Sequence, residues 1–272
     1  TFYNWDGIGV PEDFVGFENY SKIAQDPFFW NAFKNTFTYT GIVVPIQLTL
    51  ALTLAIILNS RRLRLKNLFK VIFFSPIITS PAIVGIVISL IIISAGDNIN
   101  HFLQSIGWIS NPVDWLGKPQ TAIWIVIAVG IWVGLGYPII YFLASLQAVN
   151  AELYDAAKVD GANDIALFWH ITIPSIRSII IIVLLLLTLH SLRVFDIVQV
   201  MTKGGPYFAT DMVSTYIYRY AFFSTGTGES DANLGFASAA AFFMGLLVML
   251  ISVIQITLTR RYTKWTFTDE EV

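Results

Sequence analysis

Five stretches of this 272-residue chain are apolar for long enough to cross a lipid bilayer. A helix rises about 1.5 Å per residue, so about 20 apolar residues span a hydrocarbon core of about 30 Å. The bilayer interior offers no hydrogen-bond partner to a peptide group, and we therefore expect each stretch to be helical. The predicted fold class is an all-α integral membrane protein, with spans at about 35–58, 69–95, 120–147, 178–201 and 234–258.

The composition supports a membrane protein and excludes several other classes. With 56% hydrophobic and only 12% charged residues, the chain lacks the charge that covers a soluble domain. A net charge of −2 leaves no basic face, so we expect no nucleic-acid partner. The absence of cysteine excludes disulfides and thiolate metal sites. The histidines have no metal-ligand spacing either, so we expect no metal site.

Proline and glycine mark where the spans bend or approach one another. Pro76 and Pro81 predict a broken or strongly bent second span, and Pro138 predicts a bend in the third. Short interfacial helices are expected at 19–24, 28–33 and 99–106. Small residues on one face of the third span, which let another helix approach closely, are Gly130, Gly134 and Gly136.

The basic residues cluster on one side of the membrane and thereby give the orientation. Cytoplasmic loops carry an excess of Lys and Arg. We therefore expect an extracytoplasmic, acidic segment at 1–34, a transmembrane domain at 35–272 and a cytoplasmic C-terminus. The excess follows the first, third and fifth spans and comprises Arg61, Arg62, Arg64, Lys66, Lys70, Lys158, Arg177, Arg260, Arg261 and Lys264.

One polar segment, residues 150–176, interrupts the apolar second half of the chain. It contains Asp155-Ala156-Ala157, three residues, Gly161, nine residues, and then Ile171-x-Ile173-Pro174. This spacing resembles the Glu-Ala-Ala loop in the membrane subunits of ABC importers, with Asp155 in place of Glu and Ile173 in place of Leu. Residues 14–20, 194–206 and 215–222 resemble the carbohydrate-uptake, maltose-transporter type of that family.

The resemblance implies the permease bundle of a type I ABC importer that carries a mono- or oligosaccharide by alternating access. It implies a second homologous permease subunit, two ABC ATPase subunits, an extracytoplasmic sugar-binding protein and membrane lipid, in a prokaryotic inner membrane. ATP and Mg²⁺ would be bound by the ATPase subunits, and this chain would bind no cofactor and catalyse no covalent reaction. The family usually has a further span before the position of Thr1, so we expect that span to be missing from this sequence.

The same resemblance implies that residues 150–176 form a cytoplasmic coupling loop, whose short helix docks in a groove of an ATPase subunit. A simpler interpretation is an amphipathic helix that caps the bundle. The helix break at Gly161 and the adjacent small residues Ala156 and Ala157 favour docking. The residues assigned to this loop are Tyr154, Asp155, Ala156, Ala157, Asp160, Gly161, Ala162, Ile171, Ile173 and Pro174.

Three ionisable residues fall inside the predicted fourth span: His190, Arg193 and Asp196. Ionisable residues within a membrane are functional candidates by default. Arg193 and Asp196 stand three apart, so on a continuous helix they can neutralise each other. We expect a structural pair facing the bundle interior, and a gate or a substrate contact is the alternative.

Sugars are recognised by aromatic faces together with amide and hydroxyl groups. Candidates for the substrate pathway are Trp132, Tyr137, Tyr141 and Gln47, and further candidates are Trp124, Asn35 and Phe242. For any single one of them, helix packing or lipid contact is the simpler interpretation. Gly204-Gly205-Pro206 lacks the Lys-Ser/Thr of a phosphate-binding loop and is interpreted as an outer turn able to contact a binding protein.

Two other function classes are compatible with a helical membrane protein. An ion-coupled secondary transporter requires polar ion ligands deep in broken helices, for which only Asp196 qualifies. A membrane enzyme requires a catalytic constellation, and none is present in or near the spans. The sequence therefore favours the importer subunit and leaves the identity of the sugar open.

Overall fold

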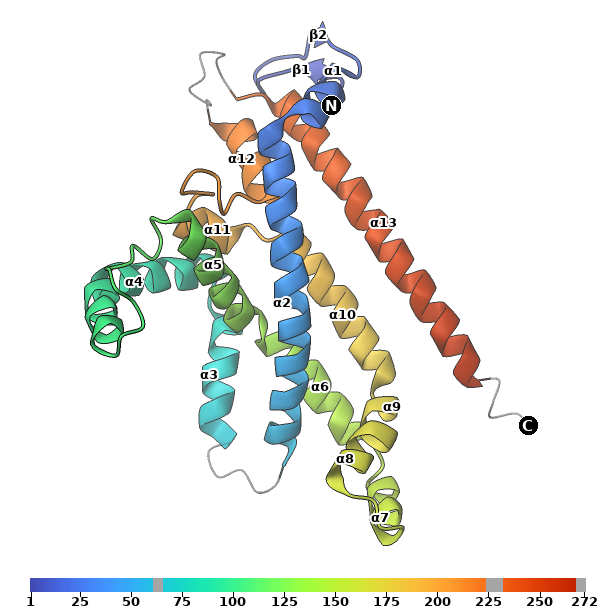
Figure 1. Cartoon of the computed structure of the whole chain (residues 1–272). Helices are drawn as coiled ribbons and strands as arrows, with labels where there is room; N and C mark the ends of the chain where they lie inside the picture. The colour runs from blue at the N-terminus through green and yellow to red at the C-terminus, as the bar shows by residue number, and fades with distance from the viewer. Residues whose placement is uncertain (61–65, 224–231, 268–272) are drawn as a thin grey trace. The chain divides into compact units, whose positions relative to one another are not determined.

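A computed structural model of the chain describes residues 1–60, 66–223 and 232–267 (Figure 1). The basic residues Arg61, Arg62 and Arg64, used above for orientation, lie outside these ranges. The side chains of five further basic residues used in that argument are not described either: Lys66, Lys70, Arg260, Arg261 and Lys264.

The described chain is almost entirely helical. Two short strands, β1 (Tyr3–Asn4) and β2 (Asp13–Phe14), pair antiparallel near the N-terminus, with Tyr3 opposite Phe14. The helices are α1 (Glu18–Gln25), α2 (Pro27–Asn59), α3 (Lys66–Ile78), α4 (Pro81–Ser105), α5 (Pro119–Gly134), α6 (Gly136–Ala148), α7 (Ala151–Val159), α8 (Asp164–Leu167), the π-helix η1 (Phe168–Thr172), α9 (Ile173–Ser175), α10 (Arg177–Leu192), α11 (Asp196–Met201), α12 (Val213–Phe222) and α13 (Leu234–Phe267).

The predicted number of spans and the helical fold class are confirmed. Within the described ranges, five helical stretches are long and apolar enough to cross a membrane. They are Pro27–Asn59, Pro81–Ser105, Pro119–Ala148, Arg177–Met201 and Leu234–Thr259.

Four of the helical stretches differ from the predicted spans mainly at their ends, whereas the predicted second span, 69–95, divides between α3 and α4, and the helix long enough to cross the membrane is Pro81–Ser105. α1 confirms the short helix predicted at 19–24, whereas residues 28–33 are part of α2 and 99–105 are part of α4, so neither forms a separate helix. The second span is interrupted at Thr79 and Ser80, directly before Pro81, because proline disfavours helix in the residue that precedes it. The third is interrupted at Leu135, and Pro138 falls in the first turn of α6, where a missing N–H costs little.

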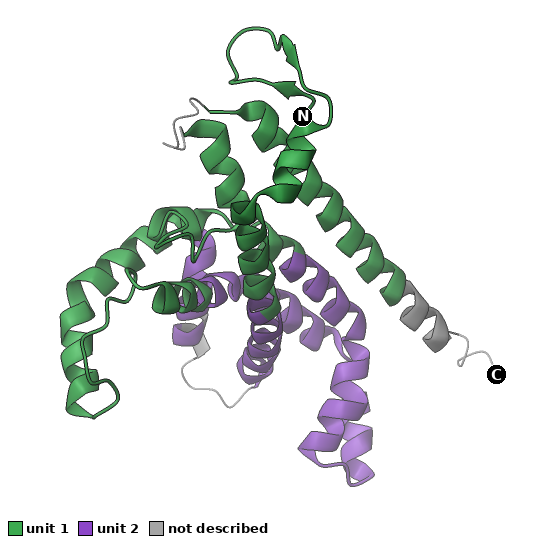
Figure 2. Cartoon of the chain, turned by 45° about the horizontal axis from the view of Figure 1, so that its top comes forward, with its two compact units in different colours: residues 1–41, 81–129, 189–272 green, residues 42–80, 130–188 purple. Residues whose placement is uncertain are grey.

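The chain divides into two compact units, each with its own hydrophobic core (Figure 2). Unit 1 comprises residues 1–41, 81–129 and 189–272, and its core includes Phe29 and Tyr216. Unit 2 comprises residues 42–80 and 130–188, and its core includes Phe142 and Ile176.

In unit 1, the N-terminal end of α2 binds segments that are far away in sequence. The carboxylate of Asp26, directly before α2, accepts hydrogen bonds from the hydroxyl groups of Tyr216 and Tyr220 on α12. Burial, reinforced by Asp26, raises the pKa of Tyr216, so this hydroxyl stays protonated and donates. Phe29 is fully buried, with its ring centroid 5.5 Å from that of Tyr216. The α1–α2 corner is thereby fixed to α12.

In unit 2, the glycines of the third span allow the close approach that the sequence predicts. The amide Nε2 of buried Gln47 on α2 donates to the carbonyls of Gly130 and Ile131 at 3.0 and 3.2 Å, and a side chain at Gly134 would collide with that amide. A methyl group at Gly136 would collide with the Ile77 side chain and lie 3.0 Å from the Phe73 carbonyl oxygen. The glycine at 134 therefore leaves room for the Gln47 side chain of α2 against the backbone of α5, and the glycine at 136 lets α6 approach the backbone of α3.

We predict that Gly136→Val lowers the stability of the purified protein by about 1–3 kcal/mol, because a side chain here pushes α6 away from the fixed backbone of α3. The matched control is Gly245→Val on α13, where an added Cβ meets no atom within 4 Å. Both changes place the same valine side chain on a helix, so a difference between their thermal unfolding temperatures in detergent reports mainly the packing effect. Equal melting temperatures for the two variants would show that the α3–α6 contact contributes nothing.

Candidate functional site

The polar segment after α6 folds into a projecting finger, defined as α7, α8 and the turn between them, residues 151–167. The Oδ1 atom of Asn150 caps α7 by accepting a hydrogen bond from the Glu152 N–H at 3.0 Å. No residue of α7 is buried against the rest of the chain. A helix this short is normally stabilised by packing of an apolar face. Because α7 buries no residue, it depends on its caps and on a side-chain hydrogen bond to the segment that follows.

Gly161 ends α7 in a left-handed backbone conformation, with φ of 84°. The Gly161 N–H donates to the Lys158 carbonyl at 3.0 Å, and the Ala162 N–H donates to the Ala157 carbonyl at 2.9 Å. These two bonds are the Schellman motif, which satisfies the last carbonyls of a helix and reverses the chain. The sequence motif thus requires glycine at position 161 because the backbone there is left-handed. The small residues Ala157 and Ala162 meet across the turn.

The segment that follows the finger, η1, is connected to α7 by a side-chain hydrogen bond. The hydroxyl groups of Tyr154 on α7 and Thr172 in η1 lie 3.1 Å apart, and the buried Thr172 hydroxyl also donates to the Leu167 carbonyl at 3.3 Å. Asn163 caps α8 through a 2.8 Å bond from the Ala166 N–H. From η1 the chain runs through α9 to fully buried Ile176, so the finger is anchored directly in the core of unit 2.

The outer surface of the finger is apolar where a solvated loop would be polar. Val159 and Ile165 are 89% and 71% exposed, and Leu153 is half exposed. Trp169, which follows the finger in η1, is exposed as well. Lys158 and Asp155 form only an exposed pair at 3.9 Å, which contributes little. Exposed apolar side chains on a projecting, polar-rimmed element are typical of a protein-docking surface.

The predicted coupling-loop residues divide into two groups. Tyr154 and Ala157 face the chain itself, while Asp155, Ala156 and Asp160 are exposed. Ile171 and Ile173 are half-buried and Pro174 is exposed in the return to α10. The sequence analysis missed the two asparagine caps, although an asparagine directly before each helix was the available signal. It also missed Val159 and Ile165, which form the exposed apolar surface, and Thr172, which bonds the segment after the finger to α7.

The predicted pair of Arg193 with Asp196 is wrong. α10 ends at Leu192 and α11 begins at Asp196, so the continuous helix on which the pairing depends is absent. Ion pairs among the described residues join Lys22 to Glu18, Lys158 to Asp155 and Arg219 to Asp211, and none joins Arg193 to Asp196. Both side chains and that of His190 are exposed on the chain instead of facing its interior.

The candidate pathway residues lie in different environments. Trp132 is half-buried on α5, and Tyr137 and Tyr141 are exposed one turn apart on α6. The Gln47 amide is buried and used in helix packing, as described above. Asn35 also has its amide engaged, by the Phe208 and Asp211 carbonyls of unit 1. Trp124 and Phe242 are exposed.

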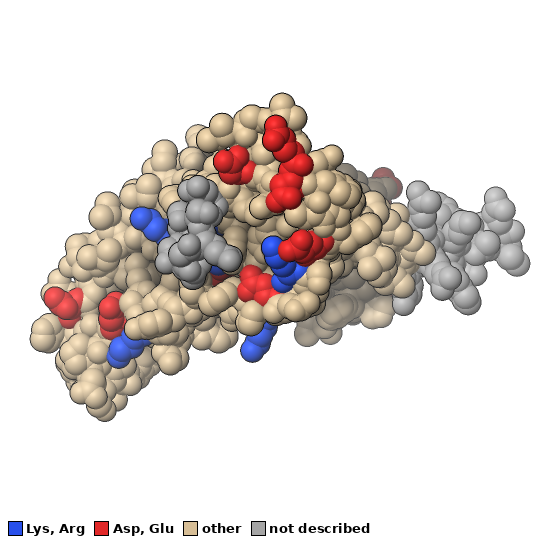
Figure 3. Space-filling model, turned by 90° about the horizontal axis from the view of Figure 1, so that it is seen from above, with Lys and Arg blue, Asp and Glu red and all other residues tan. Residues whose placement is uncertain are grey.

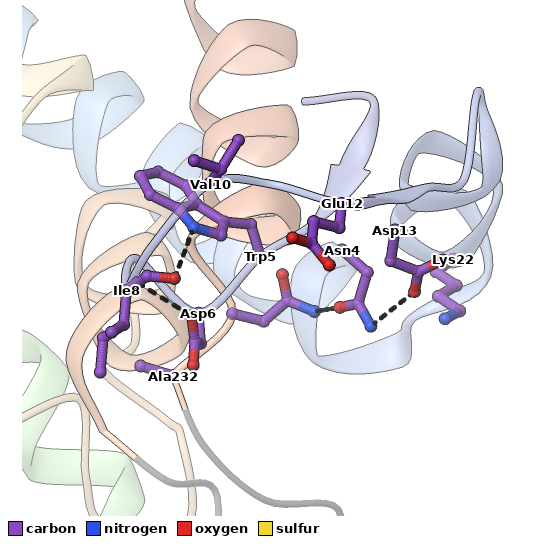
Figure 4. A pocket seen from close by; sticks show the side chains of 10 residues that line it. Asn4, Trp5, Asp6, Ile8, Val10, Glu12, Asp13, Lys22 and Ala232 are labelled. Atoms are coloured by element: carbon purple, nitrogen blue, oxygen red, sulfur yellow. Dashed lines mark hydrogen bonds between the residues drawn. The ribbon is translucent and has the colours of Figure 1, made fainter.

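A pocket of about 630 Å³ lies in unit 1 between the β1–β2 hairpin and the start of α13 (Figure 4). Its amide groups are bonded to neighbours: Asn233 donates to Asn4 at 2.7 Å, and Asn4 donates to Asp13 at 3.3 Å. Acidic side chains gather on this end of unit 1 (Figure 3). The pocket lining includes Asp6, Glu12 and Asp13 but a single lysine, Lys22, so it disfavours an anionic ligand. Across the described chain, no three His, Asp or Glu side chains gather to hold a metal ion.

Comparison with known proteins identifies relatives along most of the chain. Residues 47–264 match the family described as "Binding-protein-dependent transport system inner membrane component". The lactose transport system permease protein LacF of Rhizobium radiobacter is 32% identical over 92% of this chain and 83% of its own length. The sulfoquinovosyl glycerol transport system permease protein SmoG of Agrobacterium fabrum is 30% identical over 93% and 79%.

Solved structures agree with the sequence relatives. A chain of a bacterial ABC transporter involved in alginate import matches with a TM-score of 0.78 and 27% identity, over 91% of this chain and 84% of that one. The bacterial alginate ABC transporter in complex with an alginate pentasaccharide-bound periplasmic protein matches with a TM-score of 0.79 and 27% identity, over 92% and 84%. The importer resemblance is confirmed: the chain belongs to the family of inner membrane components of binding-protein-dependent transport systems.

Proposed function

We propose that this chain is one permease subunit of an ATP-driven importer that carries a sugar from a solute-binding protein across the inner membrane. The relatives support a sugar because they are named for lactose and sulfoquinovosyl glycerol, and the solved structures for alginate. A periplasmic protein is bound in one of those structures, which supports delivery by a binding protein. The second permease subunit would cover part of the exposed apolar surface of the five spans, and lipid the rest.

The finger docks on an ATPase subunit, and its exposed apolar surface is the observation that carries this proposal. Val159 and Ile165 gain free energy when an apolar groove removes them from water. ATP and Mg²⁺ are held by the ATPase subunits, and this chain contributes no group to hydrolysis. Its contribution is mechanical, because movement of the groove displaces α7 and α8 together.

The local structure supports the transmission of such a movement. Two asparagine caps, the Schellman turn at Gly161 and the Tyr154–Thr172 contact leave the finger few internal degrees of freedom. The chain then enters the core of unit 2 at Ile176. A displacement at Val159 is therefore passed to α10, and the bundle alternates between inward-open and outward-open states.

The orientation follows from charge. The finger lies on the cytoplasmic side, where the basic residues are concentrated, and the acidic segment before α2 lies outside. The sugar pathway runs between the two permease subunits, with the exposed aromatic pair Tyr137 and Tyr141 on α6 and the half-buried Trp132 on α5 as its lining from this chain.

We predict that Val159→Glu lowers ATP-dependent uptake in proteoliposomes at least about tenfold, because a carboxylate carried into an apolar interface loses its hydration without a partner. The matched control is Val10→Glu, since Val10 is 79% exposed but lies in the N-terminal segment. Copurification of the ATPase subunits is measured in parallel and falls for Val159→Glu alone. Unchanged uptake in Val159→Glu, or uptake driven by an ion gradient without ATP, would contradict the proposal.

We predict that Gly161→Val uncouples ATP hydrolysis from uptake, whereas Gly161→Asn retains coupling. An added Cβ at Gly161 meets no atom within 4 Å, so the effect comes only from the left-handed backbone, which asparagine tolerates and valine does not. The measurement is the number of ATP molecules hydrolysed per sugar transported. Identical ratios for the two variants would show that the Schellman turn is not required for coupling.

A further inference from the structure

The loop between α11 and α12, residues 202–212, has a strained backbone. Three residues other than glycine adopt left-handed conformations: Lys203, Tyr207 and Phe208, with φ of 52°, 50° and 59°. A side chain in this conformation crowds the following carbonyl oxygen, and bulky residues rarely adopt it. Two consecutive aromatic residues in it persist only if the surroundings hold them there.

Part of that restraint comes from inside the loop. The side chain of Thr210 is completely buried. Its hydroxyl donates to the Gly205 carbonyl at 2.6 Å and lies 2.7 Å from the Thr202 hydroxyl, while the Thr210 N–H donates to the Gly204 carbonyl at 3.2 Å. These contacts close the loop across its base.

The rest of the restraint comes from α2 and α12. The amide of Asn31 donates to the Phe208 carbonyl at 2.7 Å, and that of Asn35 to the Asp211 carbonyl at 3.0 Å. Arg219 pairs with the fully buried Asp211 at 2.8 Å and places its guanidinium 4.6 Å from the centroid of the Phe208 ring. The position after Tyr207, Phe208, is thus fixed from two elements, α2 and α12.

Tyr207 itself takes no part in these contacts and is 90% exposed. The hydrogen bonds and ring contact of the neighbouring loop residues hold the strained backbone of Tyr207 in place, while its aromatic ring projects away from the chain. Tyrosine is enriched among the residues that dominate protein interfaces, because it offers a large contact area and loses little side-chain freedom. A rigid loop with a projecting tyrosine has the properties of a docking anchor.

We propose that Tyr207 anchors the solute-binding protein on the outer face of the importer. This inference rests on the proposed function and names one contact of that partner. The loop is bonded to the N-terminal end of α2, next to the acidic segment assigned to the outside. A lipid headgroup has no fixed shape and therefore gains nothing from a preorganised loop. A folded protein that binds a preorganised loop does not have to order that loop, so less conformational entropy is lost on binding.

The anchor is connected to two spans of unit 1. Asn31 and Asn35 tie the loop to α2, and its other end continues into α11. α11 packs closely on α4, where a Cβ at Gly85 would lie 2.5 Å from the Val200 side chain. Docking at Tyr207 therefore acts on α2 through hydrogen bonds and on α4 through α11.

The test measures binding of the purified solute-binding protein to the complete importer in nanodiscs. Tyr207→Gly removes the ring and relieves the left-handed strain, so the variant should be at least as heat-stable as the wild type. We expect it to bind at least about tenfold more weakly, as for an interface hot spot. Tyr207→Phe should bind within about threefold of the wild type, because it keeps the ring area. The matched control is Trp108→Ala, an aromatic residue of unit 1 that is 78% exposed.

Three results would overturn the inference. If Tyr207→Gly binds the solute-binding protein as tightly as the wild type, Tyr207 is not a docking contact, and the proposed function is unaffected. A loss of affinity that parallels a lower melting temperature or poorer nanodisc assembly would show a structural or lipid-anchoring role. If the wild-type importer binds no solute-binding protein, the proposed function fails together with the inference.

Discussion

A peptide group without a hydrogen-bond partner in hydrocarbon costs several kcal/mol, and this constraint limits how the chain can depart from helix within a span. The interruptions of the third and fourth spans keep their backbone groups bonded locally. At Leu135 the N–H donates to the Trp132 carbonyl at 3.3 Å, and the Leu135 carbonyl accepts from the Ile139 N–H at 3.2 Å. At the second interruption, the Arg193 N–H donates to the His190 carbonyl at 3.2 Å. Bends are thus compatible with a membrane environment.

Once the spans are fixed, we propose that the segments that leave the membrane carry the interactions with partners. Two such segments, the finger and the 202–212 loop, are held rigid by opposite means. In the finger, a glycine adopts the left-handed conformation without strain, and helix caps satisfy the chain ends. In the loop, tyrosine and phenylalanine adopt that conformation under strain, and side chains from α2 and α12 hold them. Each presents an exposed side chain, Val159 or Tyr207, from a fixed backbone.

Much of the architecture was predictable from local sequence. The length of the apolar stretches predicted the number of spans, and Pro81 predicted the interruption between α3 and α4. The spacing from Asp155 to Pro174 indicated the family. The glycines of the third span predicted close packing because a missing side chain has the same consequence in any environment. These signals depend on residues near one another in the chain.

The features that sequence missed depend on contacts between distant residues. The prediction of an Arg193–Asp196 pair was wrong because no local sequence signal marks the end of α10 at Leu192. Three non-helical residues separate it from α11. Among the described residues, Asp211 is instead the buried carboxylate that pairs with an arginine, Arg219, and the fold of unit 1 sets its burial. Likewise, Asn35 looked like a pathway residue, but its amide is engaged by a loop more than 170 positions away. Spacing rules cannot supply such partners.

The proposed contact between the finger and an ATPase subunit can be measured by site-specific crosslinking. The chain contains no cysteine, so Val159→Cys carries its only thiol and accepts one photoreactive maleimide label. Irradiation of the assembled importer in native membranes is predicted to yield a covalent adduct between this chain and the ATP-hydrolysing subunit. An adduct only with lipid or with the chain itself, or labelling of this thiol by an impermeant reagent from outside the cell, would rule out that the finger docks on the ATPase subunit.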